Sequence, residues 1–365
     1  MAKPTGKQYK FLDLSGYMFS GKAAAIDLIR EFEGYYVPNY RFEFPLIRIQ
    51  DGIMDLEKAL VDDWSPIRSD VAVKRFMKLV TKMSGHKRRT FSIKEEKLIS
   101  WSYNQLLGEK FYQYSCEYAE SLIDIKIKAG WPYYEMCETF DEIFRRRLKK
   151  VFRILLSLLK GQGIPKQPIF NEIDLFIASG DGFYEKTQSY LENILSIPLS
   201  SEVVHTIVMH NAFEPFNPWR AIRYFKDAKC IVVDRDPRDI YVTALSYSEG
   251  FNDDPSVYSK ISCAFNVKYF IKRFEILRKN TNISKDDGDR ILRISFERMV
   301  MEYEETVRKI YQFLGESEDT HTKKGLFFNP FNSVKNIGLW RNYAHQDEID
   351  MIYSRLKAYC FNTKP

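Results

Sequence analysis

Residues 11–29 read FLDLSGYMFSGKAAAIDLI, the pattern of a strand, a glycine-bounded loop and a helix. Its apolar start predicts a buried strand, and the apolar residues after Lys22 recur at helical spacing. The loop between them, Gly16 to Lys22, fits the phosphate-loop pattern G-x-x-x-x-G-K-[ST] except at its last position, where Ala23 stands in place of a hydroxyl. Such a loop is an anion site because backbone N–H groups and the positive helix end converge on it. Since Ala23 cannot ligate magnesium, we expect a phosphate that is handled without a metal.

The rest of the chain alternates apolar strands with helices. Strands are predicted at 203–209, 230–233 and 291–295, and helices at 182–195, 237–248, 265–279, 302–314 and 347–361. This alternation predicts an α/β fold, a P-loop-like parallel sheet flanked by helices, in a single domain over residues 1–365. Residues 50–165 are predicted to form a large, mainly helical insertion, in which an apolar stripe runs from 140 to 159.

The composition is that of a globular protein, and the mildly basic charge suits an anionic ligand. Hydrophobic residues make up 45% of the chain and charged residues 28%, and the net charge is +6. The basic run 145–150 is either a solvated helix face or a surface for an acidic acceptor. A nucleic-acid-binding protein usually has a denser basic patch than this run, so we do not expect nucleic acid as a partner.

The cysteine pattern and the hydropathy of the chain indicate the cellular compartment of the protein. The five cysteines include no C-x-x-C pair, so we expect reduced thiols and a cytoplasmic protein. No apolar run approaches the roughly 18 residues of a membrane span, and the polar N-terminus lacks a signal-peptide core. The oligomeric state stays open.

A second motif, CIVVDRDPRDIYVTALS, covers residues 230–246. Asp234, at the end of an apolar strand, could be the acidic half of a magnesium site, but Ala23 speaks against that. Arg235 at the strand end, with the Thr243 hydroxyl on the following helix, instead forms a phosphate clamp of charge and directed hydrogen bonds.

Together these motifs resemble the sulfotransferases that use 3′-phosphoadenosine-5′-phosphosulfate (PAPS). The 3′-phosphate motif of that family is R-[DN]-P-[RK]-D with a Ser eight residues after the first Arg; here 235–239 read RDPRD, and Thr243 holds the eighth place. The segment SVKNIGLWRNY, 333–343, is similar to the late basic-Gly-Trp segment that covers the nucleotide. The opening loop resembles the 5′-phosphosulfate loop, commonly P-K-S-G-T, although Phe19 replaces its lysine.

The resemblance implies a PAPS-dependent sulfotransferase that releases 3′,5′-adenosine diphosphate (PAP) and needs no metal. It implies these nucleotide-binding residues: Ser20, Gly21, Lys22, Ala23, Arg235, Thr243, Lys335, Gly338 and Trp340. Lys22 is also a candidate for stabilising the leaving group. His210, at a predicted strand end, matches the family's strand-end histidine and is the candidate general base, ahead of Glu43 and Asp51.

The identity of the acceptor is inferred less directly from the sequence than the identity of the donor. The insertion 50–165 lies where such enzymes vary to fit their acceptors, and its aromatic residues suit the faces of sugars. A hydroxyl or amine of a glycan or glycan precursor is therefore the first expectation, and a small natural product the second.

Two other functions stay open. A P-loop kinase or NTPase would explain the loop and Asp234 but not Ala23. A non-catalytic anion- or nucleic-acid-binding protein could use the basic helix at 140–160, but it would leave both phosphate motifs unexplained.

Overall fold

The computed structural model describes residues 8–38, 43–85, 102–129, 140–161, 173–199, 203–246 and 257–361. Its centre is a five-stranded sheet in which every neighbouring pair of strands is parallel, in the order β2-β5-β1-β6-β7. The strands are β1 (Lys10–Gly16), β2 (Tyr35–Tyr36), β5 (Thr206–His210), β6 (Ala228–Asp234) and β7 (Ile291–Ser295). The predicted parallel α/β sheet is confirmed.

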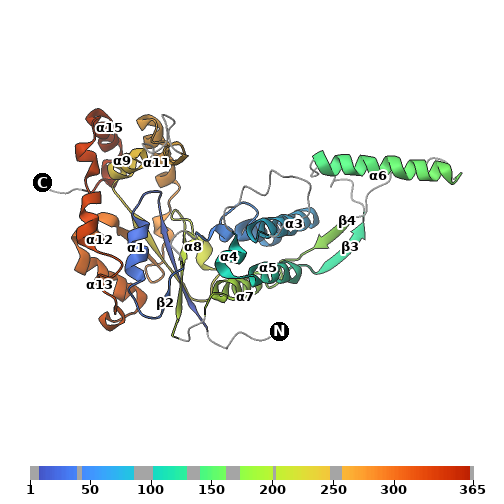
Figure 1. Cartoon of the computed structure of the whole chain (residues 1–365), viewed down its shortest axis with the longest axis horizontal. Coiled ribbons are helices and arrows are strands. Elements are labelled where there is room, and N and C mark those ends of the chain that lie inside the picture. Colours follow the sequence, from blue (N-terminus) through green and yellow to red (C-terminus); the bar gives the residue numbers. More distant parts are fainter. Residues whose placement is uncertain are drawn as a thin grey trace.

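Helices cover both faces of this sheet (Figure 1). Alternate residues of β1 enter separate cores: Leu12 and Leu14 pack with one set of helices, and Phe11 with the other. The first core includes residues of α1 (Lys22–Ile29), α12 (Phe296–Met301) and α13 (Tyr303–Leu314). A third cluster joins α9 (Pro237–Ser246), α11 (Val267–Lys279) and α15 (Gln346–Leu356).

The other core belongs to a helical layer. It contains residues of α2 (Ile53–Glu57), α3 (Pro66–Met83), α4 (Tyr103–Leu107), α5 (Lys110–Ser121), α7 (Phe183–Ser196) and α8 (Trp219–Ile222). The stacked rings of Tyr118 and Tyr190, 4.3 Å apart, join α5 to α7. Because α7 belongs to it, the layer extends past residue 165, the end of the predicted insertion. The division into a single domain with an insertion stays a prediction.

Short elements complete the fold. They are the 3₁₀ turns Pro45–Ile47, Ile283–Lys285, Glu318–Thr320, Val334–Asn336, Leu339–Asn342 and Lys357–Tyr359, the π-helix Lys58–Asp62, and the helices α10 (Val257–Ser262) and α14 (Pro330–Ser333). The helix expected at 237–248 is present to Ser246, and residues 247 and 248 lie outside the described part.

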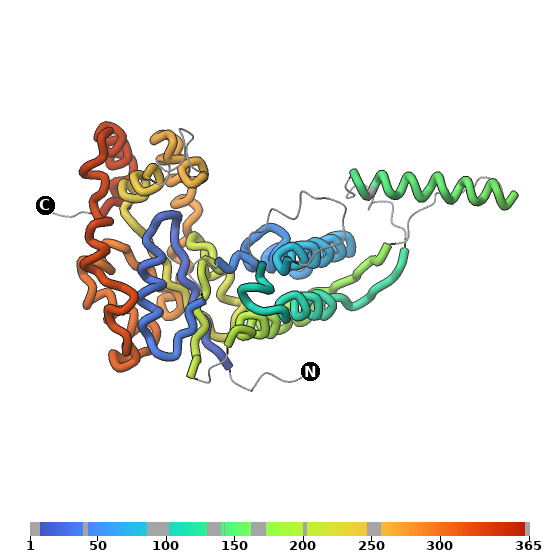
Figure 2. Tube along the Cα trace, viewed as in Figure 1, coloured from blue at the N-terminus to red at the C-terminus, as the bar shows by residue number. Residues whose placement is uncertain are grey.

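An antiparallel ribbon leads away from the helical layer. β3 (Ile125–Ala129) pairs with β4 (Ile173–Ile177), and α6 (Phe140–Leu159) lies beyond it, far from the sheet (Figure 2). The sequence predicted the helix but not the ribbon. Nowhere in the described ranges does a helix have the length and apolar character to cross a bilayer. Among described cysteines, Cys116, Cys230, Cys263 and Cys360 are free thiols.

Candidate active site

The loop between β1 and α1 has the shape of an anion site. β1 ends at Gly16 and α1 begins at Lys22, and the Ser20 N–H donates to the Tyr17 carbonyl at 2.9 Å to close the turn. Gly21 is the N-cap, with φ at 82°. It has no side chain to cap the helix, so the first N–H groups are left for a ligand.

Two positions of this loop need glycine. A Cβ on Gly21 would collide with the Phe296 ring, and one on Gly16 would collide with Ser20 Oγ. The Ser20 hydroxyl itself is buried and has no hydrogen-bond partner among the described residues. Buried polar groups are normally satisfied, so this hydroxyl marks a place for an external polar group.

Arg235 links the second motif to the loop. It follows β6 and is 6% exposed. Its Nη1 donates to the Phe19 carbonyl at 3.0 Å and to Thr243 Oγ1 at 3.2 Å, and Nη2 donates to the Asn336 carbonyl at 2.5 Å. Phe19 has φ at 60°, an uncommon left-handed conformation for a non-glycine residue. Arg235 Nε is buried and finds no partner in the described structure, so the clamp keeps one donor for a ligand.

The other charged residues of the motif support its backbone. Arg238 donates to both oxygens of Asp236, at 3.0 and 2.6 Å, and stacks 3.9 Å over the Trp340 ring. Glu297 accepts the Asp236 N–H at 2.8 Å, and burial raises the pKa of Glu297 to about 7. The guanidinium of Arg238 is thus engaged by Asp236 and Trp340.

The segment 335–340 packs against this motif. The Asp239 carboxylate accepts the N–H groups of Gly338 at 2.8 Å and of Trp340 at 3.3 Å. Gly338 has φ at 74°, which allows the turn. Lys335 is exposed on the 3₁₀ turn that carries Asn336. The predicted nucleotide-binding residues Lys335, Gly338 and Trp340 therefore lie near Arg235, although they are far from the loop in sequence.

A polar cluster lies beside the loop. Lys22 Nζ is 3.1 Å from Glu43 Oε1, and the Asn211 side-chain amide donates to the same oxygen at 2.6 Å. Arg48 Nη2 is 3.5 Å from Glu43 Oε2, and Arg48 Nε donates to the Asn211 carbonyl at 2.6 Å. By contrast, the Ala23 side chain is exposed on α1.

The ionisation of this cluster follows from its contacts. Burial acts to raise the pKa of Glu43, but Lys22, Asn211 and Arg48 outweigh it and hold that pKa below the usual 4.5. Burial lowers the pKa of Lys22, opposed by Glu43. Glu43 is therefore a carboxylate at neutral pH, in contact with a cation of the loop.

His210 is less favourably placed than expected. It is the last residue of β5, its exposed fraction is 0%, and its carbonyl accepts the Phe44 N–H at 2.9 Å. Glu43, whose side chain is 47% exposed, has the access that a base needs. The carboxylate of Asp51 is 4.0 Å from Arg75, an arginine of α3. The assignment of His210 stays a prediction, and burial favours Glu43.

A buried scaffold holds Asn211 in place. Asn211 has φ at 47°, and the next two N–H groups, of Ala212 and Phe213, donate to Asp13 at 2.8 and 3.3 Å. Ser15 Oγ donates to the Phe213 carbonyl at 2.7 Å. Burial raises the pKa of Asp13 to about 6. The sequence analysis did not identify Asn211 as a site residue. The signal for this turn was the presence of polar residues, Asp13 and Ser15, inside an apolar strand.

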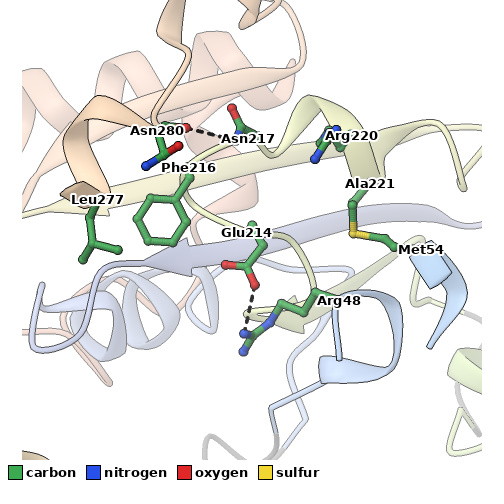
Figure 3. Close-up of a pocket in the computed structure, with 9 residues that line it drawn as sticks. All are labelled: Arg48, Met54, Glu214, Phe216, Asn217, Arg220, Ala221, Leu277 and Asn280. Carbon is green, nitrogen blue, oxygen red and sulfur yellow. Dashed lines mark hydrogen bonds and ion pairs between the residues drawn. The ribbon is translucent and has the colours of Figure 1, made fainter. Parts of the chain in front are cut away.

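A pocket of about 160 Å³ adjoins the cluster (Figure 3). Arg48 is shared by both, since its Nη1 is 3.3 Å from Glu214 Oε1 in the pocket wall. Asn217 donates to the Asn280 carbonyl at 3.2 Å. The remaining lining drawn in Figure 3 comes from Phe216, Met54, Leu277, Ala221 and Arg220.

Comparison with known proteins gives a match that includes the Arg235–Thr243 clamp. A model of the sulfotransferase family matches residues 220–320. This segment, less than a third of the chain, is similar to the sulfotransferase family. The matched segment contains Arg235, Thr243 and the strands β6 and β7, whereas the phosphate loop and the 335–340 segment lie outside it. This match supports an enzyme, a sulfotransferase.

Two solved structures of sulfotransferases are similar to this chain. The sulfotransferase domain of the olefin synthase from Synechococcus PCC 7002 is 12% identical, over 99% of this chain and 98% of that one, with a TM-score of 0.36. Sulfotransferase STF1 from Mycobacterium tuberculosis H37Rv is 12% identical, over 97% and 77%, with a TM-score of 0.39. A comparison with curated protein sequences gave no match.

Proposed function

We propose that this sulfotransferase moves a sulfuryl group from PAPS to a hydroxyl or amine of a glycan or glycan precursor. One observation carries the proposal: Arg235 joins two anion sites by its 3.0 Å hydrogen bond to the Phe19 carbonyl. Each site holds a buried polar atom without a partner in the described structure, Ser20 Oγ in one and Arg235 Nε in the other. A donor with phosphates at both ends would satisfy both atoms.

The residues present fit such a donor. The N–H groups of the loop and the N-terminus of α1 suit the 5′-phosphosulfate, and Arg235 with Thr243 suits the 3′-phosphate. Gly338 and Trp340, held on Asp239, would cover the nucleotide. When bound, PAPS supplies an activated sulfuryl group.

The remaining groups have roles in the transfer. Lys22 and the loop N–H groups neutralise the charge that develops on the departing phosphate, the role that magnesium has in nucleotide triphosphate chemistry. Glu43, ionised and exposed beside Lys22, accepts the proton of the acceptor. His210 is the second candidate for that proton.

The pocket of Figure 3 supports a sugar acceptor. Arg48, Asn217 and Arg220 offer hydrogen-bond donors, and the Phe216 ring offers an apolar face, a combination that binds hydroxyl-rich rings. Met54 brings the helical insertion to this pocket, which supports an acceptor-facing role for residues 50–165. A small natural product is the second candidate acceptor, and the cytoplasmic location stays a prediction from the cysteine pattern.

PAP is expected to raise the melting temperature without magnesium, and ATP to raise it only weakly. Saturation at a hundred times the dissociation constant adds about 2.7 kcal/mol to the free energy of unfolding. Differential scanning fluorimetry with and without magnesium and chelator checks this. A magnesium-dependent shift with ATP that exceeds the shift with PAP would instead support the kinase or NTPase alternative.

Arg235→Ala is expected to weaken PAP binding by about 1.5–3 kcal/mol, because a charge-assisted hydrogen bond to the 3′-phosphate is lost. Calorimetry with PAP and with adenosine 5′-phosphosulfate, which has no 3′-phosphate, measures the difference. Thr243→Val serves as the graded control, since it removes one neutral donor and should cost about 0.5–1.5 kcal/mol. Equal losses for both nucleotides would show that Arg235 does not bind the 3′-phosphate.

A further inference from the structure

The helix α6 exposes its apolar side to solvent. Its exposed apolar side chains range from 41% exposure at Leu156 to 83% at Leu159. In α13, which is also amphipathic, Val307, Ile310, Phe313 and Leu314 are buried. The exposed side chains of α6 are Phe140, Phe144, Leu148, Val151, Phe152, Leu155, Leu156, Leu158 and Leu159. We call this set the α6 apolar face.

The polar side of α6 is strongly basic. At 100° per residue, Arg146, Lys149, Lys150 and Arg153 fall on the side opposite the centre of the α6 apolar face. Among the described side chains of the helix, the acidic one is Asp141, in the first turn, where it complements the helix dipole. We call these four basic residues the α6 basic face.

This pattern does not suit a second copy of the chain. A coiled-coil seam uses two positions in seven, with charged flanks that pair acid with base. The α6 apolar face is wider than such a seam. The residues that flank the heptad seam Phe144, Leu148 and Val151 are Arg145, Arg147 and Phe152, so two copies would bring like charges together without acidic partners.

We propose that α6 docks this protein on a membrane surface that contains anionic lipid. A helix with a broad apolar face containing Phe and Leu, and with a Lys- and Arg-rich polar face, lies in the plane of the interface. The apolar side chains enter the acyl boundary, and the basic residues contact lipid phosphates. α6 also stands clear of the sheet, at the end of the β3–β4 ribbon (Figures 1 and 2). The proposal does not depend on the sulfuryl-transfer assignment.

Co-sedimentation of the full chain with vesicles tests the proposal. The vesicles are phosphatidylcholine alone, or with about one-third phosphatidylglycerol. We expect binding to the anionic vesicles that weakens with salt. The variant Phe144→Ser/Phe152→Ser should lower the partition coefficient at least about tenfold, because two large apolar side chains no longer leave water. Arg146→Ser/Lys150→Ser/Arg153→Ser should also lower it about tenfold or more.

The control is Ile283→Ser/Met301→Ser, which changes two exposed apolar residues outside α6 and should leave vesicle binding intact. Circular dichroism and light scattering accompany each variant. Equal or absent sedimentation with the two vesicle types would overturn the proposal. So would an oligomer that dissociates on Phe144→Ser/Phe152→Ser, which would indicate a second copy. Loss of binding in the basic variant alone would indicate a polyanion instead of a bilayer.

Discussion

Glu43→Gln is expected to lower turnover by about 10²–10⁴-fold, the usual contribution of a general base. The amide keeps the size of the side chain and can still contact Lys22 and Arg48, so the melting temperature and PAP affinity should change little. Single-turnover measurements with PAPS and a sulfated product read by mass separate the chemical step from binding.

The pH dependence identifies the base. Contacts with Lys22, Asn211 and Arg48 hold the pKa of Glu43 below 4.5, so its carboxylate form persists at neutral pH. Activity that depends on this carboxylate should stay level through the range near 6.5, where an imidazole titrates, and fall only as the pH drops below the usual Glu value. An ascending limb near 6.5 would indicate His210 instead.

His210→Ala is the contrasting variant. The side chain is fully buried at the end of β5, so its removal leaves a cavity. We expect a loss of stability of about 2–5 kcal/mol, comparable with other large-to-small substitutions in a core. A His210→Ala enzyme that folds like the wild type and loses turnover, beside a Glu43→Gln enzyme that keeps it, would contradict the assignment of Glu43.

The sheet could be predicted because its signals are local. β7 has the predicted bounds Ile291–Ser295, and β6 extends the predicted 230–233 at both ends. A central parallel strand is a short apolar run, and the loop at Gly16 has a residue-by-residue pattern. The strand β2, two residues long, and the ribbon β3–β4 have no such signal. In β3, four of five residues are exposed, so tertiary pairing and not hydrophobic burial defines the strand.

The sequence predicted the Arg235–Thr243 clamp, but it predicted only part of the polar cluster around Glu43. Arg235 and Thr243 are eight residues apart on one strand–helix unit, and sequence spacing fixes their contact. Glu43 and Asn211 are 168 residues apart and meet because Phe44, next to Glu43, donates its N–H to the carbonyl of His210 at the end of β5, the strand that lies between β2 and β1. That strand order is not readable from one sequence, which is why the strand-end histidine drew the prediction instead of the asparagine next to it.

Lys22→Met should lower turnover by about 10²–10³-fold, the cost of removing one donor that stabilises charge in the transition state. Methionine keeps the apolar length of the side chain, so α1 should fold normally. A second effect follows from the contact at 3.1 Å with Glu43. Because Lys22 is the largest of the influences that lower the pKa of Glu43, its removal should raise that pKa. The acid limb of the activity profile should therefore move to higher pH.

The matched control for this variant is Lys309→Met. Lys309 also pairs with a glutamate, Glu305, at 2.6 Å, but on the exposed surface of α13. It tests whether the loss of an ion pair alone lowers activity, and turnover and the acid limb should both stay as in the wild type. In Lys22→Met the two readouts have separate causes: the fall in turnover reports charge stabilisation by the loop, and the shifted limb reports contact with the base. If turnover fell and the limb did not move, Lys22 would act on the leaving group while another residue served as the base.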